Sequence, residues 1–181
     1  MLDRGYRRAS VTDIAAAAGV NVDTMYALVG RKPLLLREII EQAISGVDRA
    51  VPADERDYVA AIRAEPDAQR KLRIYAAATR RTQERLAPIV RVIREAGPSE
   101  PEVAELWHEI TERRAQNMRQ LVADVVAAAP LRPELTIETA ADIVWTLNST
   151  DVYLLLTGDR GWSTDDYERW LGDAWAAMLL A

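Results

Sequence analysis

The sequence of 181 residues contains no cysteine, no phenylalanine and a single histidine. The absence of cysteine excludes disulfides and thiolate metal sites, and one histidine leaves few pairings of a nucleophile with a base. No apolar run approaches the roughly 20 residues needed to span a bilayer, and no secretory signal pattern opens the chain. We therefore expect a cytoplasmic protein with no membrane partner.

The charge is unevenly distributed along the chain. The net charge of -5 taken alone argues against nucleic-acid binding. Residues 1–45, however, carry six basic and five acidic side chains, whereas the remaining 17 basic and 23 acidic side chains give -6. The hydrophobic content of 49% is ample for a buried core. This asymmetry is mild, a hint and no more.

The composition predicts an all-α protein, because alanine and arginine are abundant and alternating β-branched runs are few. Helix start and stop signals divide the chain into the following expected helices: 10–18, 21–28, 32–45, 55–64, 67–85, 88–96, 101–128, 136–156 and 163 to the end. We expect two domains, a helix-turn-helix domain over residues 1–45 and a larger helical bundle over residues 46–181.

Capping signals define the first two helices most clearly. Ser10 and Asp13 have the spacing of a capping box, and Gly19 suits the left-handed position that ends the helix. Asn21 is then a good N-cap for the second helix. Further along the chain, Thr136 and Ser163 are the expected N-caps of the last two helices.

Two short helices joined by a tight glycine turn make a helix-turn-helix, whose second helix can enter a major groove. Its outward-facing residues are Asn21, Val22, Asp23, Tyr26 and Ala27. At the helix starts nearby, Thr12 and Lys32 are placed to contact phosphates. These seven residues form the predicted DNA-binding surface.

The stretch from Thr12 to Leu35 resembles the signature of TetR-family regulators, through "TDIA", "AGV", "TMY" and "KPLL" at the family's spacing. The back half, with "DIVWTLNSTDVYLLL" and "YERWL", is similar to the C-terminal domain of an actinobacterial branch of that family. The resemblance covers almost the whole chain. It implies a homodimeric, ligand-responsive transcription factor, usually a repressor, on a palindromic double-stranded DNA operator. Thr12, Tyr26 and Lys32 would contact phosphates, and Asn21, Val22, Asp23 and Ala27 would face bases.

The chain departs from the family pattern at three places. Leu28 and Val29 stand where the family often has histidine and phenylalanine, and Asp23 puts an acid on the recognition face. Only nine residues precede Ser10, where the family has a complete helix. We expect roughly 15–25 further residues upstream, an ordinary helix and a flexible arm.

The larger domain has the aromatic and polar residues of a small-molecule pocket on its inner helices. The candidate ligand-binding residues are Tyr75, Thr79, Trp107, His108, Thr111, Arg114, Asn117, Trp145 and Asn148. They suit a flat, largely apolar effector, and each has an ordinary core or surface role as its alternative. The last two helices have more apolar surface than one chain needs, which predicts a homodimer. The expected interface residues are Val144, Asp151, Leu155, Trp170, Leu171, Ala174, Trp175 and Met178.

Catalysis is the weakest interpretation of the sequence. Glu105, His108 and Glu112 partly imitate di-iron and zinc motifs, but each of those sites needs a second histidine. We expect no enzyme activity, no metal and no cofactor. The main alternative to a regulator is a helical ligand-binding or adaptor protein with an incomplete, non-functional DNA-binding module.

Overall fold

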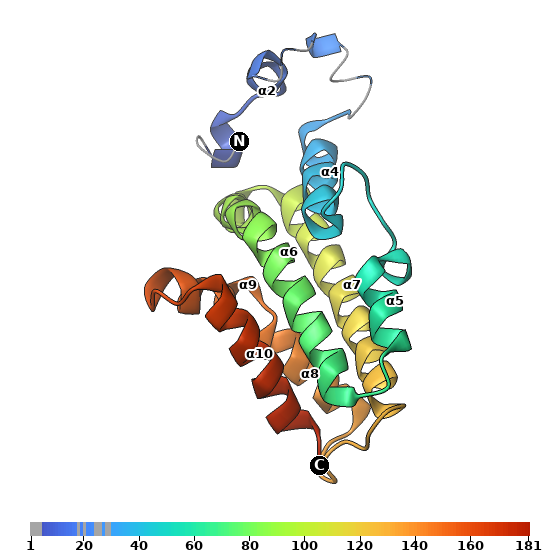
Figure 1. Cartoon of the computed structure of the whole chain (residues 1–181). Coiled ribbons are helices and arrows are strands. Elements are labelled where there is room, and N and C mark those ends of the chain that lie inside the picture. Colours follow the sequence, from blue (N-terminus) through green and yellow to red (C-terminus); the bar gives the residue numbers. More distant parts are fainter. Residues whose placement is uncertain (1–4, 18, 20, 24–26, 28–29) are drawn as a thin grey trace. The chain divides into compact units, whose positions relative to one another are not determined.

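The computed structural model describes residues 5–17, 19, 21–23, 27 and 30–181 (Figure 1). These residues form helices, apart from loops and one isolated β-bridge between Leu131 and Leu180, so the all-α prediction is confirmed. Among the described helices, none combines the length and apolarity that a membrane span requires. The chain divides into two compact units, residues 1–50 with 85–110, and residues 51–84 with 111–181.

Unit 1 contains the N-terminal helices and the adjoining ends of two long helices. Its elements are α1 (Gly5–Arg8), α2 (Val11–Ala17), α4 (Lys32–Ser45), residues 85–96 of α6 (Ala68–Ala96), η2 (Gly97–Ser99) and residues 101–110 of α7 (Pro101–Val126). The expected first domain ended at residue 45. The first unit takes in the long-helix ends as well, because α4 buries its apolar face against them.

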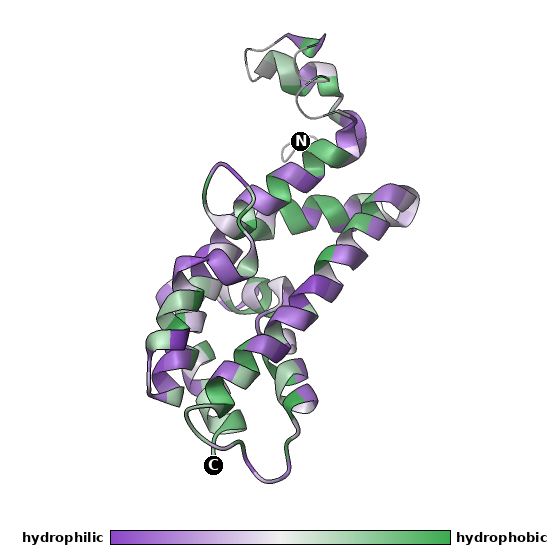
Figure 2. Cartoon of the chain, turned by 90° about the vertical axis from the view of Figure 1, so that its right-hand side faces the viewer, coloured by the Kyte–Doolittle hydropathy of each residue, from purple (hydrophilic) through white to green (hydrophobic). Residues whose placement is uncertain are grey.

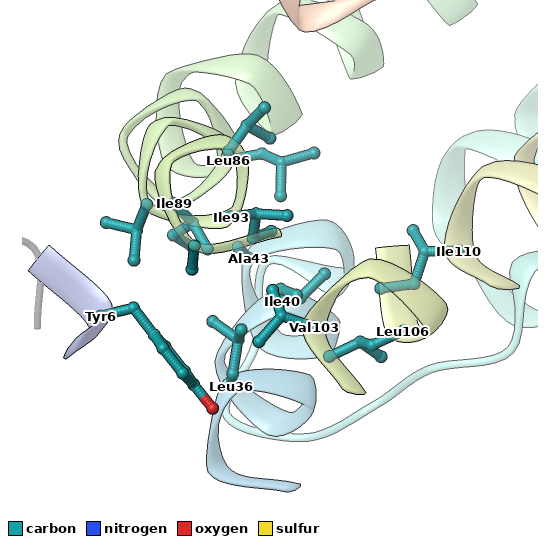
Figure 3. Packing of buried hydrophobic residues seen from close by; sticks show 13 residues of the cluster. Tyr6, Leu36, Ile40, Ala43, Leu86, Ile89, Ile93, Val103, Leu106 and Ile110 are labelled. Atoms are coloured by element: carbon teal, nitrogen blue, oxygen red, sulfur yellow. The ribbon is translucent and has the colours of Figure 1, made fainter. Parts of the chain in front are cut away.

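The core of unit 1 is built from four helices (Figure 3). Leu36 and Ile40 of α4 are 1% and 0% exposed, and they pack with buried side chains of α6 and α7. Tyr6 reaches into the same cluster from α1 and is 5% exposed. Apolar burial of this kind is the main stabilising term for short helices, which are marginal alone.

The predicted capping box is confirmed at the start of α2. Asp13 N donates to Ser10 Oγ at 3.0 Å, and Ser10 N donates to Asp13 Oδ2 at 3.0 Å. After α2, Gly19 has φ of +69°, a left-handed conformation that glycine adopts without steric cost. The turn and the helix start before it are therefore set by local chemistry.

Unit 2 contains the remaining helices. Its elements are η1 (Ala53–Glu55), α5 (Asp57–Ala64), residues 68–84 of α6, residues 111–126 of α7, α8 (Ile137–Leu147), α9 (Thr150–Leu154), the π-helical η3 (Leu155–Asp159) and α10 (Thr164–Leu179). Polar and apolar residues alternate in bands along the helices (Figure 2), as expected for helices that bury one face.

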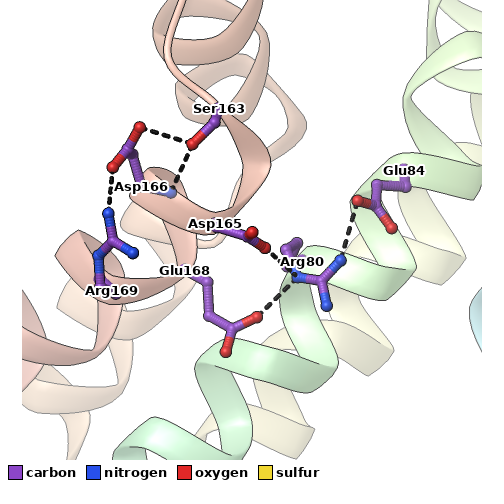
Figure 4. A network of polar contacts seen from close by, with 7 residues as sticks. All are labelled: Arg80, Glu84, Ser163, Asp165, Asp166, Glu168 and Arg169. Carbon is purple, nitrogen blue, oxygen red and sulfur yellow. Dashed lines mark hydrogen bonds and ion pairs between the residues drawn. The ribbon is translucent and has the colours of Figure 1, made fainter.

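Helix α10 packs closely on α6 within unit 2. A Cβ added at the buried Gly172 would lie 3.2 Å from Arg73 Cγ, so glycine permits this approach. Arg80 of α6 joins the helices through its Nε, 2.6 Å from Glu168 Oε2, and its Nη1 lies 3.0 Å from Glu84 Oε1 (Figure 4). The start of α10 is capped by Ser163, as predicted.

Pro88 lies inside α6, where the sequence predicted a boundary between two helices. Proline removes one helical hydrogen bond and usually kinks or ends a helix, at a cost of about 3 kcal/mol. Here the exposed proline is surrounded by Leu86, Ala87, Ile89 and Val90, all buried in unit 1. The packing of these neighbours explains why the helix continues through Pro88.

The expected single helix over residues 136–156 is divided in the structure. Thr136 caps α8 as predicted, by accepting a hydrogen bond from Thr139 N at 3.2 Å. The helix then ends at Asn148, and Ser149 caps α9 by accepting from Val152 N. The division matters because Asn148 is a buried polar residue of unit 2.

Candidate functional site

The predicted DNA-binding residues are largely exposed in unit 1. Thr12, Asn21, Asp23 and Ala27 are exposed, and Val22 is half-buried. Tyr26, Leu28 and Val29 lie outside the described residues. The described part of this predicted surface therefore carries small side chains, polar and apolar, and one acid.

Asn21 has a structural role that competes with base recognition. Its Oδ1 accepts a hydrogen bond from Asp23 N at 2.7 Å, the contact that an N-cap makes with the second residue after it. The cap uses the carboxamide oxygen, while the amide NH₂ donors stay available. An asparagine held this way keeps both amide donors and the second lone pair of its oxygen for a base edge, but the cap fixes the direction in which they point.

Lys32 is turned towards α1 in the structure. Its Nζ donates to the Tyr6 carbonyl and lies 4.1 Å from the centre of the Tyr6 ring, a cation–π contact. Burial lowers the pKa of Lys32, and the charge of Glu100 opposes that shift. A phosphate contact by Lys32 therefore requires the side chain to leave Tyr6.

Three further basic side chains of the N-terminal region pair with glutamates at and after the start of α7. The ion pairs are Arg7–Glu100 at 3.5 Å, Arg31–Glu102 at 3.4 Å and Arg37–Glu109 at 2.6 Å. The last is bidentate, since both nitrogens of the guanidinium end meet both carboxylate oxygens. With Lys32, four of the five basic residues that the structure describes in 1–45 contact groups of unit 1.

The main polar cluster of unit 2 is centred on Asn148, which is 4% exposed. Arg114 Nη1 donates to Asn148 Oδ1 at 2.9 Å, and Asn148 Nδ2 donates to the Tyr75 hydroxyl at 2.9 Å. Arginine is only a donor, so these two bonds define the orientation of the amide. The Arg114 guanidinium also lies over the Trp145 ring, 4.3 Å from its centre. Four predicted ligand-binding residues thus meet in one place.

Burial shifts the titration of two members of this cluster. It raises the pKa of Tyr75 far above its ordinary value, so the phenol keeps its proton and donates to Met118 Sδ at 3.2 Å. Burial also lowers the pKa of Arg114, and the charge of the Asp151 carboxylate opposes that shift. The cluster is a desolvated polar site, in which each hydrogen bond is harder to replace than at the surface.

A cavity of about 450 Å³ opens beside this cluster, between η1, α5, α6 and α7. Tyr75 and Met118 form part of its wall, with the Tyr58 ring centre 6.0 Å from that of Tyr75. The Arg63–Asp124 ion pair, at 3.9 Å, lies on the same wall. This mixture of aromatic, amide and charged groups offers both apolar contacts and hydrogen-bond partners to a small molecule.

The other predicted ligand-binding residues are distributed as follows. Asn117 lines the cavity, and Thr79 is buried one helical turn after Tyr75. Thr111 is half-buried in unit 2. Trp107 and His108 belong to unit 1, where Trp107 packs on the hydrophobic cluster and His108 is exposed.

Sequence reasoning missed Gln83, whose side chain is 4% exposed. Its position eight residues after Tyr75 and four after Thr79 places all three on one face of α6, which is the signal that could have identified it. Within the part of the chain that the structure describes, no group of three or more histidine and carboxylate side chains is placed to hold a metal ion.

Part of the predicted dimer surface is buried within the single chain. Val144, Leu171 and Trp175 are 0% exposed there, so they pack as core residues of unit 2. The apolar surface of the two helices is partly used by the core of unit 2, where Trp175 stacks on Tyr75. The expected interface residues that keep accessible surface are Asp151, Leu155, Trp170, Ala174 and Met178.

Comparisons with known proteins find the same fold in transcriptional regulators. A protein from Saccharomonospora viridis described as a transcriptional regulator, solved in complex with choline, is 18% identical, with a TM-score of 0.69 over 99% of this chain and 91% of its own. The TetR-family regulator PfmR from Thermus thermophilus is 19% identical, with a TM-score of 0.61 over 99% of this chain and 93% of its own. No family model matches the sequence. No curated protein matches it either. The chain has the fold of TetR-family regulators.

Proposed function

We propose that this chain is a cytoplasmic DNA-binding transcriptional regulator, a homodimer that releases a palindromic operator when a small molecule binds. The observation that carries the proposal is the capped pair Ser10 and Asp13 followed by the Gly19 turn and the Asn21 cap. These features are the ones expected at the start of a helix-turn-helix, and they lie where the sequence resembles the family signature. The fold shared with regulators over nearly the whole chain supports the same function.

In this mechanism a dimer places two recognition helices in successive major grooves, about 34–36 Å apart. The effector binds in the cavity of unit 2 and favours a dimer with another spacing. DNA affinity then falls by the ratio of the effector's affinities for the two states. Repression is the mode that the family resemblance favours.

The cavity beside Tyr75 is the proposed effector site. Tyrosine faces and the Asp124 carboxylate can accept an organic cation, and the Saccharomonospora viridis protein was solved with choline. Choline is therefore the first probe for isothermal titration calorimetry. Asp124→Asn weakens binding if the cation lies on this wall, whereas Glu134→Gln, on an exposed residue outside the cavity, leaves binding unchanged.

DNA binding is tested by fluorescence anisotropy on a duplex from the chain's own upstream intergenic region, with random duplex as competitor. We expect specific binding that weakens steeply as salt rises, because phosphate contacts release counterions. Absence of binding by a well-folded dimer would contradict the regulator proposal.

Two substitutions separate phosphate contacts from base contacts. Thr12→Val removes a hydroxyl and is expected to weaken binding to all sequences by a similar factor. Asn21→Ser keeps a side-chain cap for the helix but removes the carboxamide, so we expect a changed sequence preference without loss of helix stability. A uniform effect of Asn21→Ser on all duplexes would contradict a base contact.

An adaptor or ligand-binding protein without DNA affinity is the second candidate. The observation that favours it is the engagement of Arg7, Arg31, Lys32 and Arg37 within unit 1, together with the exposed acid Asp23. Ligand binding without any DNA affinity at low salt would identify this function.

A further inference from the structure

The break between α8 and α9 is held by one buried side chain from another helix. Gln83 Nε2 donates to the Asn148 carbonyl oxygen at 2.6 Å, and Gln83 Oε1 accepts from Thr150 Oγ1 at 2.9 Å. Asn148 ends α8 and Thr150 begins α9, so Gln83 bonds to both sides of the break. Gln83, Asn148 and Thr150 are all 5% exposed or less, and such bonds cannot be exchanged freely for bonds to bulk water.

The same break is bonded to the wall of the cavity. Asn148 Nδ2 donates to the Tyr75 hydroxyl at 2.9 Å and approaches Met118 Sδ at 3.2 Å, and both partners line the cavity. A single side chain, that of Asn148, therefore connects the cavity wall to the break between α8 and α9. An occupant that displaces the Tyr75 phenol must also remove a hydrogen bond from Asn148.

The segment that follows the break has an irregular geometry and an exposed apolar side chain. After α9 the chain continues as the π-helical η3, a conformation that is rare and marks local irregularity. Leu155 begins this segment and is 53% exposed. Leu155 belongs to the expected dimer surface, so a conformational change at the break would alter the surface available for dimerisation.

We infer that the hydrogen-bonded chain Tyr75–Asn148–Gln83–Thr150 transmits occupancy of the cavity to the α8–α9 break. An occupant that moves Tyr75 removes one of the hydrogen bonds that hold the Asn148 side chain, while the bond from Arg114 remains, and so loosens residues 148–159. Asn148 is a positioning residue in this scheme. The regulatory meaning of the coupling rests on the proposed ligand response, whereas the coupling itself is a property of unit 2.

Hydrogen–deuterium exchange of the full chain, measured by mass spectrometry without DNA or effector, tests the coupling. Tyr75→Phe keeps the ring and removes the hydroxyl that Asn148 bonds, so exchange in residues 148–159 becomes about tenfold faster. Tyr58→Phe is the matched control. Tyr58 lines the same cavity, but its hydroxyl accepts a hydrogen bond from Arg56 Nη1, at 3.3 Å, and not from Asn148. It leaves exchange in residues 148–159 within about twofold of the parent.

Filling the cavity with a side chain imitates an occupant. Val59→Trp adds bulk to the cavity wall and accelerates exchange in residues 148–159, whereas Ala60→Trp, on the exposed face of the same helix, does not. Combining Val59→Trp with Tyr75→Phe adds little to Tyr75→Phe alone, because both act through one hydrogen bond. If Val59→Trp does not fold, Ala53→Phe fills the cavity from η1 instead.

Two results would overturn the inference. One is unchanged exchange in residues 148–159 of Tyr75→Phe. The other is a cavity-filling variant that accelerates exchange equally throughout unit 2, which indicates general destabilisation. Failure of the chain to bind DNA affects neither measurement, so the coupling and the proposed function are tested separately.

Discussion

Replacing Tyr6 by alanine is the sharpest test of how the N-terminal region is held. Tyr6 is the described side chain that joins α1 to the cluster of unit 1, and it is 5% exposed (Figure 3). Its side chain lies near Leu36, and the Lys32 ammonium lies over the Tyr6 ring, 4.1 Å from the ring centre. The substitution removes the apolar contact and the cation–π contact together.

The expected loss in the free energy of unfolding of Tyr6→Ala is the sum of the losses of these two contacts. Truncating a buried aromatic residue to alanine costs about 3–5 kcal/mol in a closed core. Helix α1 has four residues and can collapse onto the gap, so we expect about 2–3 kcal/mol from lost packing. The cation–π contact adds about 0.5–1 kcal/mol, for a total of about 3 kcal/mol.

Thermal unfolding followed by far-ultraviolet circular dichroism measures the effect. For a chain of this size, about 3 kcal/mol corresponds to a fall in Tm of roughly 6–12 °C. Tyr6→Phe keeps the ring under Lys32 and is the control, with an expected change below about 0.5 kcal/mol. A loss below about 1 kcal/mol for Tyr6→Ala would refute the conclusion that Tyr6 anchors α1 to the cluster.

Three further predictions concern unit 2. Met178→Glu, at a position that is 48% exposed, is expected to convert a dimer to a monomer in analytical ultracentrifugation, with a helical circular dichroism spectrum retained and a lower Tm because dimerisation no longer stabilises the fold, and an unchanged dimer would place the interface elsewhere. Arg80→Met removes the bond to Glu168 and is expected to lower the free energy of unfolding in urea by about 1–2 kcal/mol, with a smaller loss at high salt. Equal losses at low and high salt would contradict an ionic origin of this stabilisation. The Ser163 hydroxyl, and secondarily Arg169, lowers the pKa of Asp166, so this carboxylate stabilises the fold above its ordinary pKa of 3.8 and loses that contribution as pH falls through the lowered pKa. An NMR titration should find the pKa of Asp166 raised in Ser163→Ala, and an unchanged value would contradict the assigned cause.

Much of the local structure could be predicted because it depends on neighbours in sequence. Ser10, Thr136 and Ser163 cap the helices that they were expected to cap, and Asn21 accepts the short-range hydrogen bond expected of an N-cap. Gly19 has the left-handed backbone conformation that its place after α2 required. Each of these interactions joins residues three or fewer positions apart, so no tertiary contact is needed to specify them.

The gathering of Tyr75, Arg114, Trp145 and Asn148 was also predicted, because amphipathic helices turn one face inwards. Their partner Gln83 was not. A pattern of faces shows which residues point inwards but does not show which polar groups meet once the helices are packed.

The tertiary structure alone decided where helices continue or break and which apolar residues stay accessible. Pro88 remains inside α6 because its neighbours are buried. Helix α8 ends at its C-cap, Asn148, whose backbone carbonyl accepts a hydrogen bond from Gln83 of α6. Likewise, Leu171 is fully buried while Met178 is exposed, although both lie on the predicted apolar face of α10. Propensities and periodicity act within a few residues along the chain. Burial depends on which helix supplies the opposite surface, and that is settled only when the whole core packs.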